Sequence, residues 1–184
     1  MLNKILAILM LIILSPLFII VILLIIIDDG LPVFFIQKRV GVNYTFFNLY
    51  KFRSMKKNTP NVATHLLENP EQYLLKIGKL IRKLSLDELP NLINIIKGDM
   101  VFVGPRPALY NQDDLMQLRI AAGVDKLVPG LTGWAQINGR DEISLEEKVT
   151  LEKEYMDKKS IKFDITIFFM TFASAFFKKE GVSH

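Results

Sequence analysis

The chain opens with an almost uninterrupted apolar segment. Residues 5–27 are apolar except for Ser15 and Pro16. At about 1.5 Å of rise per helical residue, this length is sufficient to cross a bilayer core of roughly 30 Å. It exceeds the apolar region of roughly 7–15 residues in a secretory signal peptide, and the DDGLP sequence that follows offers no small-residue cleavage site. The pattern therefore predicts a membrane helix that is kept in the mature protein.

A Ser-Pro pair interrupts this segment near its middle. Pro16 has no N–H to donate to the Ile12 carbonyl, so we expect a kink, and the Ser15 hydroxyl can bond a carbonyl that the break frees. Two topologies fit, a kinked spanning helix and a re-entrant hairpin that returns to the side it entered. Basic residues crowd the stretch after the segment, which favours a cytoplasmic location for the rest of the chain. They are Lys38, Arg39, Lys51, Arg53, Lys56 and Lys57.

Beyond residue 30 the pattern changes to shorter segments. Aromatic and β-branched residues lie on both sides of GVNY at residues 41–44, which predicts a β-hairpin. The polar stretch over residues 58–70 contains two prolines and predicts a loop. Residues 71–84, EQYLLKIGKLIRKL, repeat apolar side chains at helical spacing with basic side chains on the other side. This predicts an amphipathic helix suited to a membrane surface.

The C-terminal part of the chain predicts two helices. Residues 144–160 are strongly charged, as is typical of a solvated helix, and residues 165–177 are apolar but too short to cross a bilayer. Asp164 either caps the second helix or supports a functional site, and capping is the better interpretation. Together the segments predict a helix-rich α+β fold. We divide it into a membrane unit at residues 1–28 and a cytoplasmic domain with membrane-surface helices at residues 29–184.

Composition narrows the function classes. The formal net charge of +4 and the pI of about 9.2 suit anionic partners such as lipid headgroups or nucleotide phosphates. The basic residues are dispersed and form no recognised nucleic-acid-binding motif, so we expect no nucleic acid partner. The chain contains no cysteine, which excludes disulfides and thiolate chemistry and fits a reducing compartment.

The sequence KLSLDELPN at residues 83–91 places two adjacent carboxylates, Asp87 and Glu88, before a short apolar helix pattern. One interpretation is structural. Ser85 and Glu88 would form a capping box, or Asp87 would be the N-cap of a helix over residues 90–97 that ends at Gly98. For a lone aspartate in such a place, capping is the more common role.

Three features favour phosphoryl chemistry instead. Adjacent carboxylates repel each other unless cations compensate, and Lys79, Arg82 and Lys83 lie just upstream. Carboxylates in this position can hold Mg²⁺, which shares its coordination between protein and substrate phosphates. Downstream, Arg106 lies between two prolines in GPRP, and an arginine with a restricted backbone suits bidentate phosphate binding.

Three blocks carry a resemblance to a known family. They are YKFRSM at residues 50–55, RKLSLDELPNLINIIKGDMVFVGPRP at residues 82–107 and PGLTGWAQINGR at residues 129–140. In this order they resemble the bacterial sugar transferases, monotopic phosphoglycosyl transferases, over nearly the whole chain. The resemblance implies a re-entrant hairpin broken at Ser15 and Pro16. It also implies transfer of a sugar 1-phosphate from a UDP-sugar to undecaprenyl phosphate, with release of UMP, at the cytoplasmic face of the bacterial inner membrane.

The resemblance also implies roles for particular residues. Asp87 would be the nucleophile and would form a covalent phosphosugar-aspartyl intermediate. Mg²⁺ would be the cofactor, held by Asp87 and Glu88, and Glu88 would position the metal or manage a proton. We expect Arg82 and Arg106 to bind substrate phosphates.

Several further residues are weaker candidates. Lys51 and Arg53 are expected either to bind phosphates or to contact lipid headgroups from a strand. In the third block, Trp134 and Gln136 could stack on and hydrogen-bond a nucleobase, with Arg140 beside them. Packing is the ordinary role of a lone tryptophan.

Two other functions remain open. A non-catalytic membrane-surface scaffold would explain the apolar segment and the basic faces, but neither GPRP nor the carboxylate pair. A glycosyl transferase that releases UDP is the closest enzymatic rival. The expected donor is a UDP-linked, N-acetylated amino sugar, as small members of the family often use, and we make no prediction of oligomeric state. Tyr44 stands where the family pattern would have glycine, which weakens the prediction of the hairpin turn.

Overall fold

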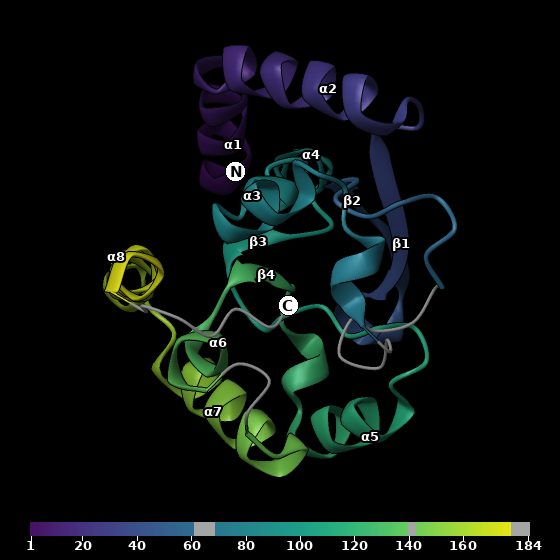
Figure 1. The fold of residues 1–184 in the computed structure, drawn as a ribbon. Helices are drawn as coiled ribbons and strands as arrows, with labels where there is room; N and C mark the ends of the chain where they lie inside the picture. Colours follow the sequence, from purple (N-terminus) through teal and green to yellow (C-terminus); the bar gives the residue numbers. More distant parts are fainter. Residues whose placement is uncertain (61–68, 140–142, 178–184) are drawn as a thin grey trace.

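The computed structural model describes residues 1–60, 69–139 and 143–177 of the 184-residue chain. Over these residues the fold is helix-rich α+β with two small sheets of two strands each, as predicted (Figure 1). The helices and strands are α1 (Leu2–Ile13), α2 (Ser15–Asp29), β1 (Phe34–Val40), β2 (Phe46–Phe52), α3 (Gly78–Lys83), α4 (Asn91–Lys97), β3 (Val101–Val103), α5 (Asp113–Ala122), β4 (Gly130–Thr132), α6 (Trp134–Asn138), α7 (Leu145–Lys158) and α8 (Ile161–Phe177). Short 3-10 turns are η1 (Val42–Tyr44), η3 (Pro70–Tyr73), η4 (Leu86–Glu88) and η5 (Val124–Lys126). Most of the loop predicted at 58–70 lies outside the described residues.

Helices α1 and α2 are bent by 62° relative to each other. The predicted break is confirmed, and the Ser15 hydroxyl donates to the Ile12 carbonyl at 2.8 Å, an acceptor that Pro16 has no N–H to bond. Among the described helices, none is by itself long and apolar enough to span a membrane. The bent pair meets this criterion of length and composition only as a unit.

Both ends of the bent pair return to the same body of the protein (Figure 1). Near the start of α1, the Lys4 ammonium donates to the Lys97 carbonyl at 3.3 Å. At the end of α2, Asp29 forms an ion pair with Arg53. The inner faces of the two helices pack against the body, where Ala7 is fully buried. Each end of the bent pair is therefore tied to the part of the protein that carries the candidate site.

The predicted β-hairpin is confirmed, with β1 and β2 paired in antiparallel orientation. Its turn contains Asn43 and Tyr44 at positive φ of 50° and 63°. A tyrosine is uncommon in this backbone region. Its hydroxyl donates to Asp113 at 2.8 Å, which ties the turn to α5. The hairpin therefore forms without a glycine at the tyrosine position.

The prediction of an amphipathic helix over residues 71–84 is mostly wrong. Its first turn is η3, and only the six residues of α3 are α-helical. The backbone between them bonds distant segments instead. Leu75 N–H donates to the Ser54 carbonyl at 3.0 Å, and Ile77 N–H donates to the Asp28 carboxylate at 3.1 Å. These tertiary bonds override the helical periodicity of the sequence.

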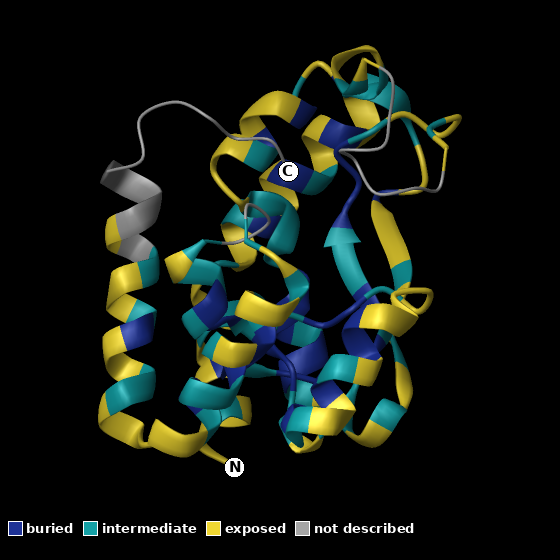
Figure 2. Cartoon of the chain, turned by 90° about the horizontal axis from the view of Figure 1, so that it is seen from below, coloured by how far each residue is buried: buried dark blue, intermediate teal, exposed yellow. Residues whose placement is uncertain are grey.

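The second sheet and the main core lie in the middle of the molecule. Strands β3 and β4 pair in parallel. Gly98, at φ of 98°, ends α4 as predicted. The buried positions in Figure 2 lie inside, where helices meet the strands, and the outward helix faces are exposed. The main buried cluster consists of Ala7, Leu49, Leu92, Ile95, Met100, Phe102, Val103, Tyr155 and Ile167.

Helix α8 follows α7 after a short connection. Ser160 caps it, since the Ser160 hydroxyl accepts from Phe163 N–H at 3.2 Å. The prediction that Asp164 is the N-cap is therefore wrong, because Asp164 lies inside the first turn. Its carboxylate instead accepts from the Tyr155 hydroxyl at 2.7 Å. Asp164 thus joins α8 to α7.

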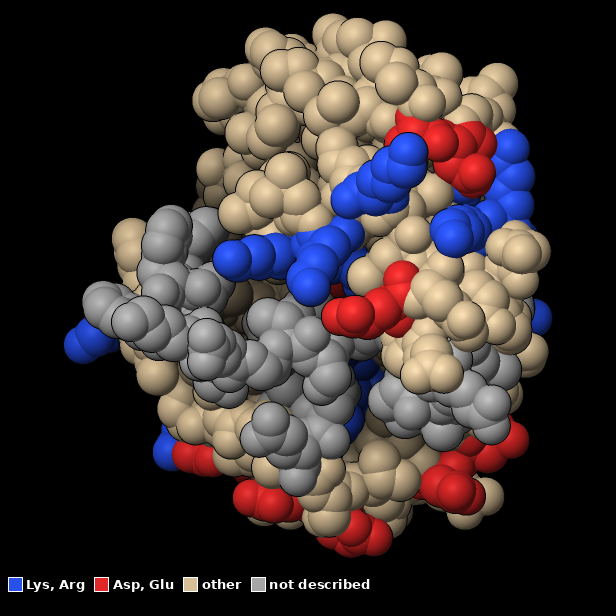
Figure 3. All heavy atoms as spheres, in the orientation of Figure 1, with Lys and Arg blue, Asp and Glu red and all other residues tan. Residues whose placement is uncertain are grey.

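Charge and apolar surface are separated on the face shown in Figure 3. The upper part, formed by α1 and α2, is almost without charged side chains. Lys and Arg side chains gather just below it, with acidic side chains among them and along the lower part. An apolar cap above basic groups suits the boundary between a bilayer and its headgroups.

Candidate active site

The two adjacent carboxylates lie in η4, a single 3-10 turn between α3 and α4. Ser85 precedes the turn in the left-handed region, with φ of 53°. The capping interpretation is wrong. Pro90 is the N-cap residue of α4, and within the described residues no side chain caps either η4 or α4. The carboxylates of Asp87 and Glu88 make their contacts with other segments instead.

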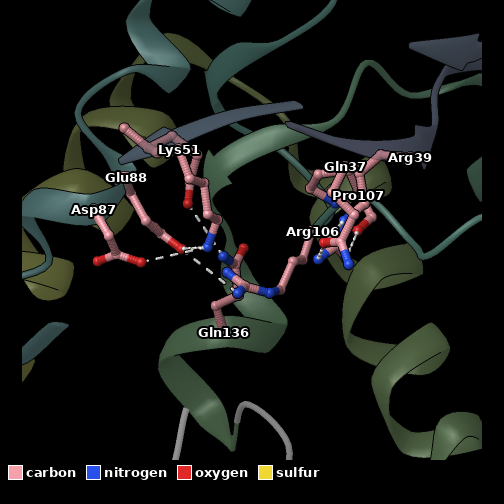
Figure 4. Close-up of polar contacts among 9 residues, drawn as sticks. Gln37, Arg39, Lys51, Asp87, Glu88, Arg106, Pro107 and Gln136 are labelled. Atoms are coloured by element: carbon pink, nitrogen blue, oxygen red, sulfur yellow. Dashed lines mark hydrogen bonds and ion pairs between the residues drawn. The ribbon is translucent and has the colours of Figure 1, made fainter. Parts of the chain in front are cut away.

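Two basic side chains from distant parts of the chain meet these carboxylates (Figure 4). Lys51, on β2, places Nζ 2.8 Å from Glu88 Oε1 and 3.7 Å from Asp87 Oδ2. Arg106, in the loop after β3, places Nη2 3.6 Å from Glu88 Oε1. The structure therefore brings together four of the residues that the sequence singled out. Each of the two cations could exchange its carboxylate contact for an oxygen of an incoming phosphate.

Burial and neighbouring charges act on Asp87 in opposite directions. Burial raises the pKa of its carboxyl, Lys51 lowers it, Glu88 raises it and Arg82 lowers it. Burial also lowers the pKa of Arg82, and the Asp87 charge raises it again. Arg82 therefore belongs to the same electrostatic cluster. The shorter contact of Lys51 goes to Glu88, at 2.8 Å, and its contact with Asp87 is longer, at 3.7 Å.

Lys51, Glu88 and Arg106 line a hollow in the protein. Its walls come from both strands of the hairpin, the start of α4, the loop after β3 and the strand β4. The lining residues are Arg39, Leu49, Lys51, Glu88, Asn91, Met100, Arg106, Pro107, Gly130 and Leu131. Asp87 adjoins the hollow through Lys51 and Glu88.

Hydrogen bonds to neighbouring segments fix the GPRP loop that carries Arg106. The Pro105 carbonyl accepts from Gly130 N–H at 2.8 Å. The Pro107 carbonyl accepts from Arg39 Nη1 at 3.0 Å, and the same guanidinium is held by Gln37 (Figure 4). The residue before a proline is restricted to an extended backbone. Arg106 is therefore presented to the hollow from a loop with little freedom.

A buried amide fixes the strand that carries Lys51. Asn94 on α4 is fully buried. Its Nδ2 donates to the Asn48 carbonyl at 2.7 Å, and its Oδ1 accepts from Tyr50 N–H at 3.1 Å. The side chain thus bonds β2 as a neighbouring strand would. Because α4 begins directly after the carboxylate pair, this contact sets the position of Lys51 relative to Glu88.

Arg53 is not brought to the hollow. It is buried, and its guanidinium forms an ion pair with Asp29 and donates to the carbonyls of Asp29 and Gly30. Arg53 therefore holds the end of α2 in place. This arrangement differs from both roles weighed for it, a phosphate ligand and a contact of lipid headgroups.

The candidate residues of the third block lie in different surroundings. Trp134 donates through Nε1 to Glu154 at 2.9 Å, and its ring centroid lies 5.1 Å from that of Phe163. These contacts correspond to the packing role. Gln136 lies beside Arg106 in Figure 4, and its buried Oε1 has no hydrogen-bond partner within the described residues. Arg140 lies outside the described residues. Of Trp134 and Gln136, Gln136 is therefore the one that lies beside Arg106. Gly130 and Leu131 of the same block line the hollow.

Sequence reasoning missed Arg39 and Asn91 as lining residues. Arg39 is one of many dispersed basic residues, and no local pattern marks it. Asn91 follows Glu88 by three residues, a spacing that places two side chains on the same side of a helical segment. This spacing could have identified Asn91.

The comparison with known protein families shows to which family the chain belongs. Residues 1–178 match the family described as "Bacterial sugar transferase". The chain belongs to the bacterial sugar transferase family. The resemblance of its three blocks is therefore confirmed, and with it the prediction that the chain is a transferase.

Curated relatives of this sugar transferase are similar in sequence and have longer chains. The present chain is 46% identical over 142 residues to "Uncharacterized sugar transferase EpsL" of Bacillus subtilis, and the match covers 77% of this chain and 69% of EpsL. It is 38% identical to the "UDP-glucose:undecaprenyl-phosphate glucose-1-phosphate transferase" of Escherichia coli, covering 95% of this chain and 39% of that protein. It is 39% identical to the "Undecaprenyl-phosphate glucose phosphotransferase" of Komagataeibacter xylinus, covering 95% of this chain and 35% of that protein. The chain thus spans less than half the length of the two named phosphotransferases.

The carboxylate pair of this sugar transferase offers the type of donor atom that the predicted magnesium cofactor prefers. No group of three or more metal-binding side chains occurs within the described residues. Asp87 and Glu88 offer hard oxygen donors, and Mg²⁺ is commonly held by one or two carboxylates together with water and substrate phosphates. A site of two carboxylates therefore suits a metal that arrives with the nucleotide.

Proposed function

We propose that this sugar transferase moves a sugar 1-phosphate from a UDP-sugar to undecaprenyl phosphate and releases UMP. The observation that carries the proposal is the Asp87–Glu88 pair held beside Lys51 and Arg106 at one hollow. The names of the E. coli and K. xylinus relatives support the acceptor, and the E. coli name supports a UDP-linked donor. An N-acetylated amino sugar is the donor we expect. A 33% identical relative from Aeromonas hydrophila, named as an N-acetylgalactosaminephosphotransferase, supports that class.

The proposed reaction consists of two displacements at one phosphorus. In the first, an Asp87 carboxylate oxygen attacks the sugar-bearing phosphorus. The bond from this phosphorus to the bridging oxygen breaks, and the electron pair leaves with that oxygen as UMP. In the second, a phosphate oxygen of undecaprenyl phosphate attacks the same phosphorus. The bond to Asp87 breaks, the carboxylate is regenerated, and the product is an undecaprenyl diphosphosugar.

The other charged residues assist by neutralising phosphate charge. Lys51 and Arg106 lie where they can exchange a Glu88 contact for a phosphate oxygen. Arg82 favours the ionised form of Asp87. Glu88 either holds the metal or manages a proton. Mg²⁺, held by Asp87 and Glu88 when bound, would supply further neutralisation of the substrate phosphates.

We further propose that α1 and α2 form a re-entrant hairpin in the cytoplasmic leaflet of the bacterial inner membrane. The contacts of Lys4 and Asp29 support this topology, because both ends of the pair bond the same body. The outward side chains support it as well, since Ile13 and Ile27 are 74% and 81% exposed. The phosphate of a polyprenol stays at the headgroup level, so a body anchored in this way would keep Asp87 near its acceptor.

The test is nucleotide release by the full-length protein in nanodiscs with Mg²⁺, undecaprenyl phosphate and a panel of UDP-sugars. Wild type is compared with Asp87→Asn, which removes the nucleophile and keeps a similar shape. Asp114→Asn, at an exposed position of α5, is the matched control. We expect wild type and the control to release UMP and Asp87→Asn to release none.

Each other result would select a different function. Release of UDP would indicate direct glycosyl transfer. Release of UMP by a folded Asp87→Asn protein would mean that another residue is the nucleophile. A wild type that releases no nucleotide with any sugar would favour a membrane-surface scaffold.

A further inference from the structure

Helices α5 and α7 contribute a buried ion pair that the proposed reaction does not use. Arg119 Nε lies 2.8 Å from Glu152 Oε2, and Arg119 Nη2 bonds the other carboxylate oxygen. The two residues are 5% and 2% exposed. Replacing a buried ion pair with apolar side chains is often neutral for stability, because desolvation of the charges offsets their attraction. Stability alone is therefore a weak reason for this pair.

A further bond of Arg119 connects the pair to the candidate active site. Nη2 also donates to the backbone carbonyl of Arg106 at 2.9 Å. The guanidinium is planar, so the two bonds to Glu152 fix the direction in which this remaining donor points. The side chain of the same residue, Arg106, approaches Glu88.

The Arg106 carbonyl is the middle one of three consecutive acceptors that other segments hold. The carbonyls of Pro105 and Pro107 are bonded by β4 and by Arg39. The prolines have no N–H with which to anchor the loop themselves. The position of the loop therefore depends on hydrogen-bond donors from other segments. Arg119 supplies the donor for the carbonyl of Arg106, the residue whose side chain enters the site.

We propose that Arg119 and Glu152 position Arg106 for phosphate binding. Glu152 orients the guanidinium of Arg119, and Arg119 holds the carbonyl from which the Arg106 side chain projects. Both are positioning residues, because they act through Arg106 and touch no substrate. The inference rests on the proposed function, in which Arg106 binds a substrate phosphate.

The test is the double substitution Arg119→Met with Glu152→Met in the full-length protein. It removes both charges together, so we expect a melting temperature close to that of wild type. We expect kcat/KM for the UDP-sugar to fall about 100-fold, the size of effect that a small misplacement of a binding group produces. In an Arg106→Ala background the same double substitution should cause no further loss, because its effect is exerted through Arg106.

Controls separate positioning from general damage. Lys153→Ala with Asp157→Ala removes an ion pair with an N–O distance of 2.9 Å from the outer side of α7, and should leave kcat/KM unchanged. If the double variant does not fold, Arg119→Lys gives the same cycle, since it keeps a charge for Glu152 and loses the fork that reaches Arg106.

Two outcomes would overturn the inference. One is an unchanged kcat/KM in a folded double variant, and the other is a loss that multiplies with that of Arg106→Ala. The affinity for UDP, measured by titration calorimetry over the same variants, gives a second reading that needs no turnover. A wild type that releases no UMP would refute the proposed function alone, and the UDP cycle would still decide the role of the pair.

Discussion

At the scale of single residues, Asp87 is held between opposing influences on its protonation. Burial raises the pKa of its carboxyl, whereas Lys51, with Nζ 3.7 Å away, lowers it. A nucleophilic carboxylate must be ionised. In the proposed reaction kcat/KM should therefore fall at acidic pH, as Asp87 takes up a proton. The lysine therefore widens the pH range over which the free enzyme can react.

Removal of that lysine should move the pH profile. In Lys51→Met the pKa of Asp87 loses its largest lowering influence and rises further, so the acidic limb of kcat/KM shifts to higher pH. At neutral pH we expect a loss on the order of 100-fold, since a phosphate-neutralising cation is also lost. Lys38→Met, at an exposed position on the same hairpin, is the control. An acidic limb that stays in place would argue against Asp87 as the titrating group.

The same burial should make the ionised Asp87 carboxylate costly for stability. In the unfolded chain Asp87 titrates near its ordinary value of 3.8, and in the native protein its pKa is raised. Between these values the native state binds more protons, so the free energy of unfolding falls as pH rises through this window. Asp87→Asn should therefore melt at a higher temperature than wild type at pH 7, by about 2–4 °C per kcal/mol for a chain of this size. The advantage should disappear at low pH. A variant that melts lower at pH 7 would contradict this expectation.

At the scale of elements, α4 sets the distance between the two halves of the site. Its buried Asn94 bonds two backbone groups of β2, while Asn91, on the same helix and 3% exposed, has a buried Oδ1 with no partner within the described residues. The two asparagines are therefore a matched pair in residue type, helix and burial. They differ in whether they bond the strand that carries Lys51.

Truncation of the two asparagines should have different consequences. Asn94→Ala leaves the Asn48 carbonyl and the Tyr50 N–H without their partner, and we expect a loss of about 2–4 kcal/mol in the free energy of unfolding. Asn91→Ala breaks no such bonds and should cost less than about 1 kcal/mol. Urea denaturation of the detergent-solubilised protein compares them. Equal losses would mean that the amide of Asn94 does not anchor the strand.

At the scale of the whole molecule, the bend between α1 and α2 would determine, in the proposed topology, on which side of a bilayer the N-terminus lies. The chain contains no cysteine, so Leu2→Cys provides a single labelling site without background. With the re-entrant topology, a membrane-impermeant maleimide should label this cysteine in inside-out vesicles and not in right-side-out vesicles. Adding Ser15→Ile and Pro16→Leu removes the break, and the labelled side should reverse as the helix straightens. Labelling of the bent protein from the outside would exclude the re-entrant hairpin.

Local signals account for the parts of the fold that the sequence predicted. The missing N–H of Pro16 locates the helix break, and the backbone freedom of Gly98 locates the end of α4. The segment over residues 71–84 could not be predicted in this way, because its N–H groups bond Ser54 and Asp28, which are distant in sequence. Asp164 is similar, since its partner Tyr155 lies on another helix.

The site residues fall into the same two groups, those that a local motif marks and those whose partners are distant in sequence. Asp87, Glu88 and Arg106 lie in motifs with a recognisable pattern of charge and proline, so the sequence identified them. Arg119 and Glu152 belong to two helices whose packing brings them together, and neither has a neighbouring residue that marks its role. A buried charge is indistinguishable from an exposed one in a sequence until its partner is known.

The lining of the hollow has a kinetic consequence. Lys51 and Arg106 both line it, and each contacts Glu88. In the two proposed displacements the nucleotide sugar and the lipid phosphate would use these same cations in turn, so the nucleotide must depart before the lipid phosphate binds. Double-reciprocal plots of initial rate at several lipid concentrations should therefore be parallel lines. Excess lipid should inhibit by competing with the nucleotide sugar for the unmodified enzyme.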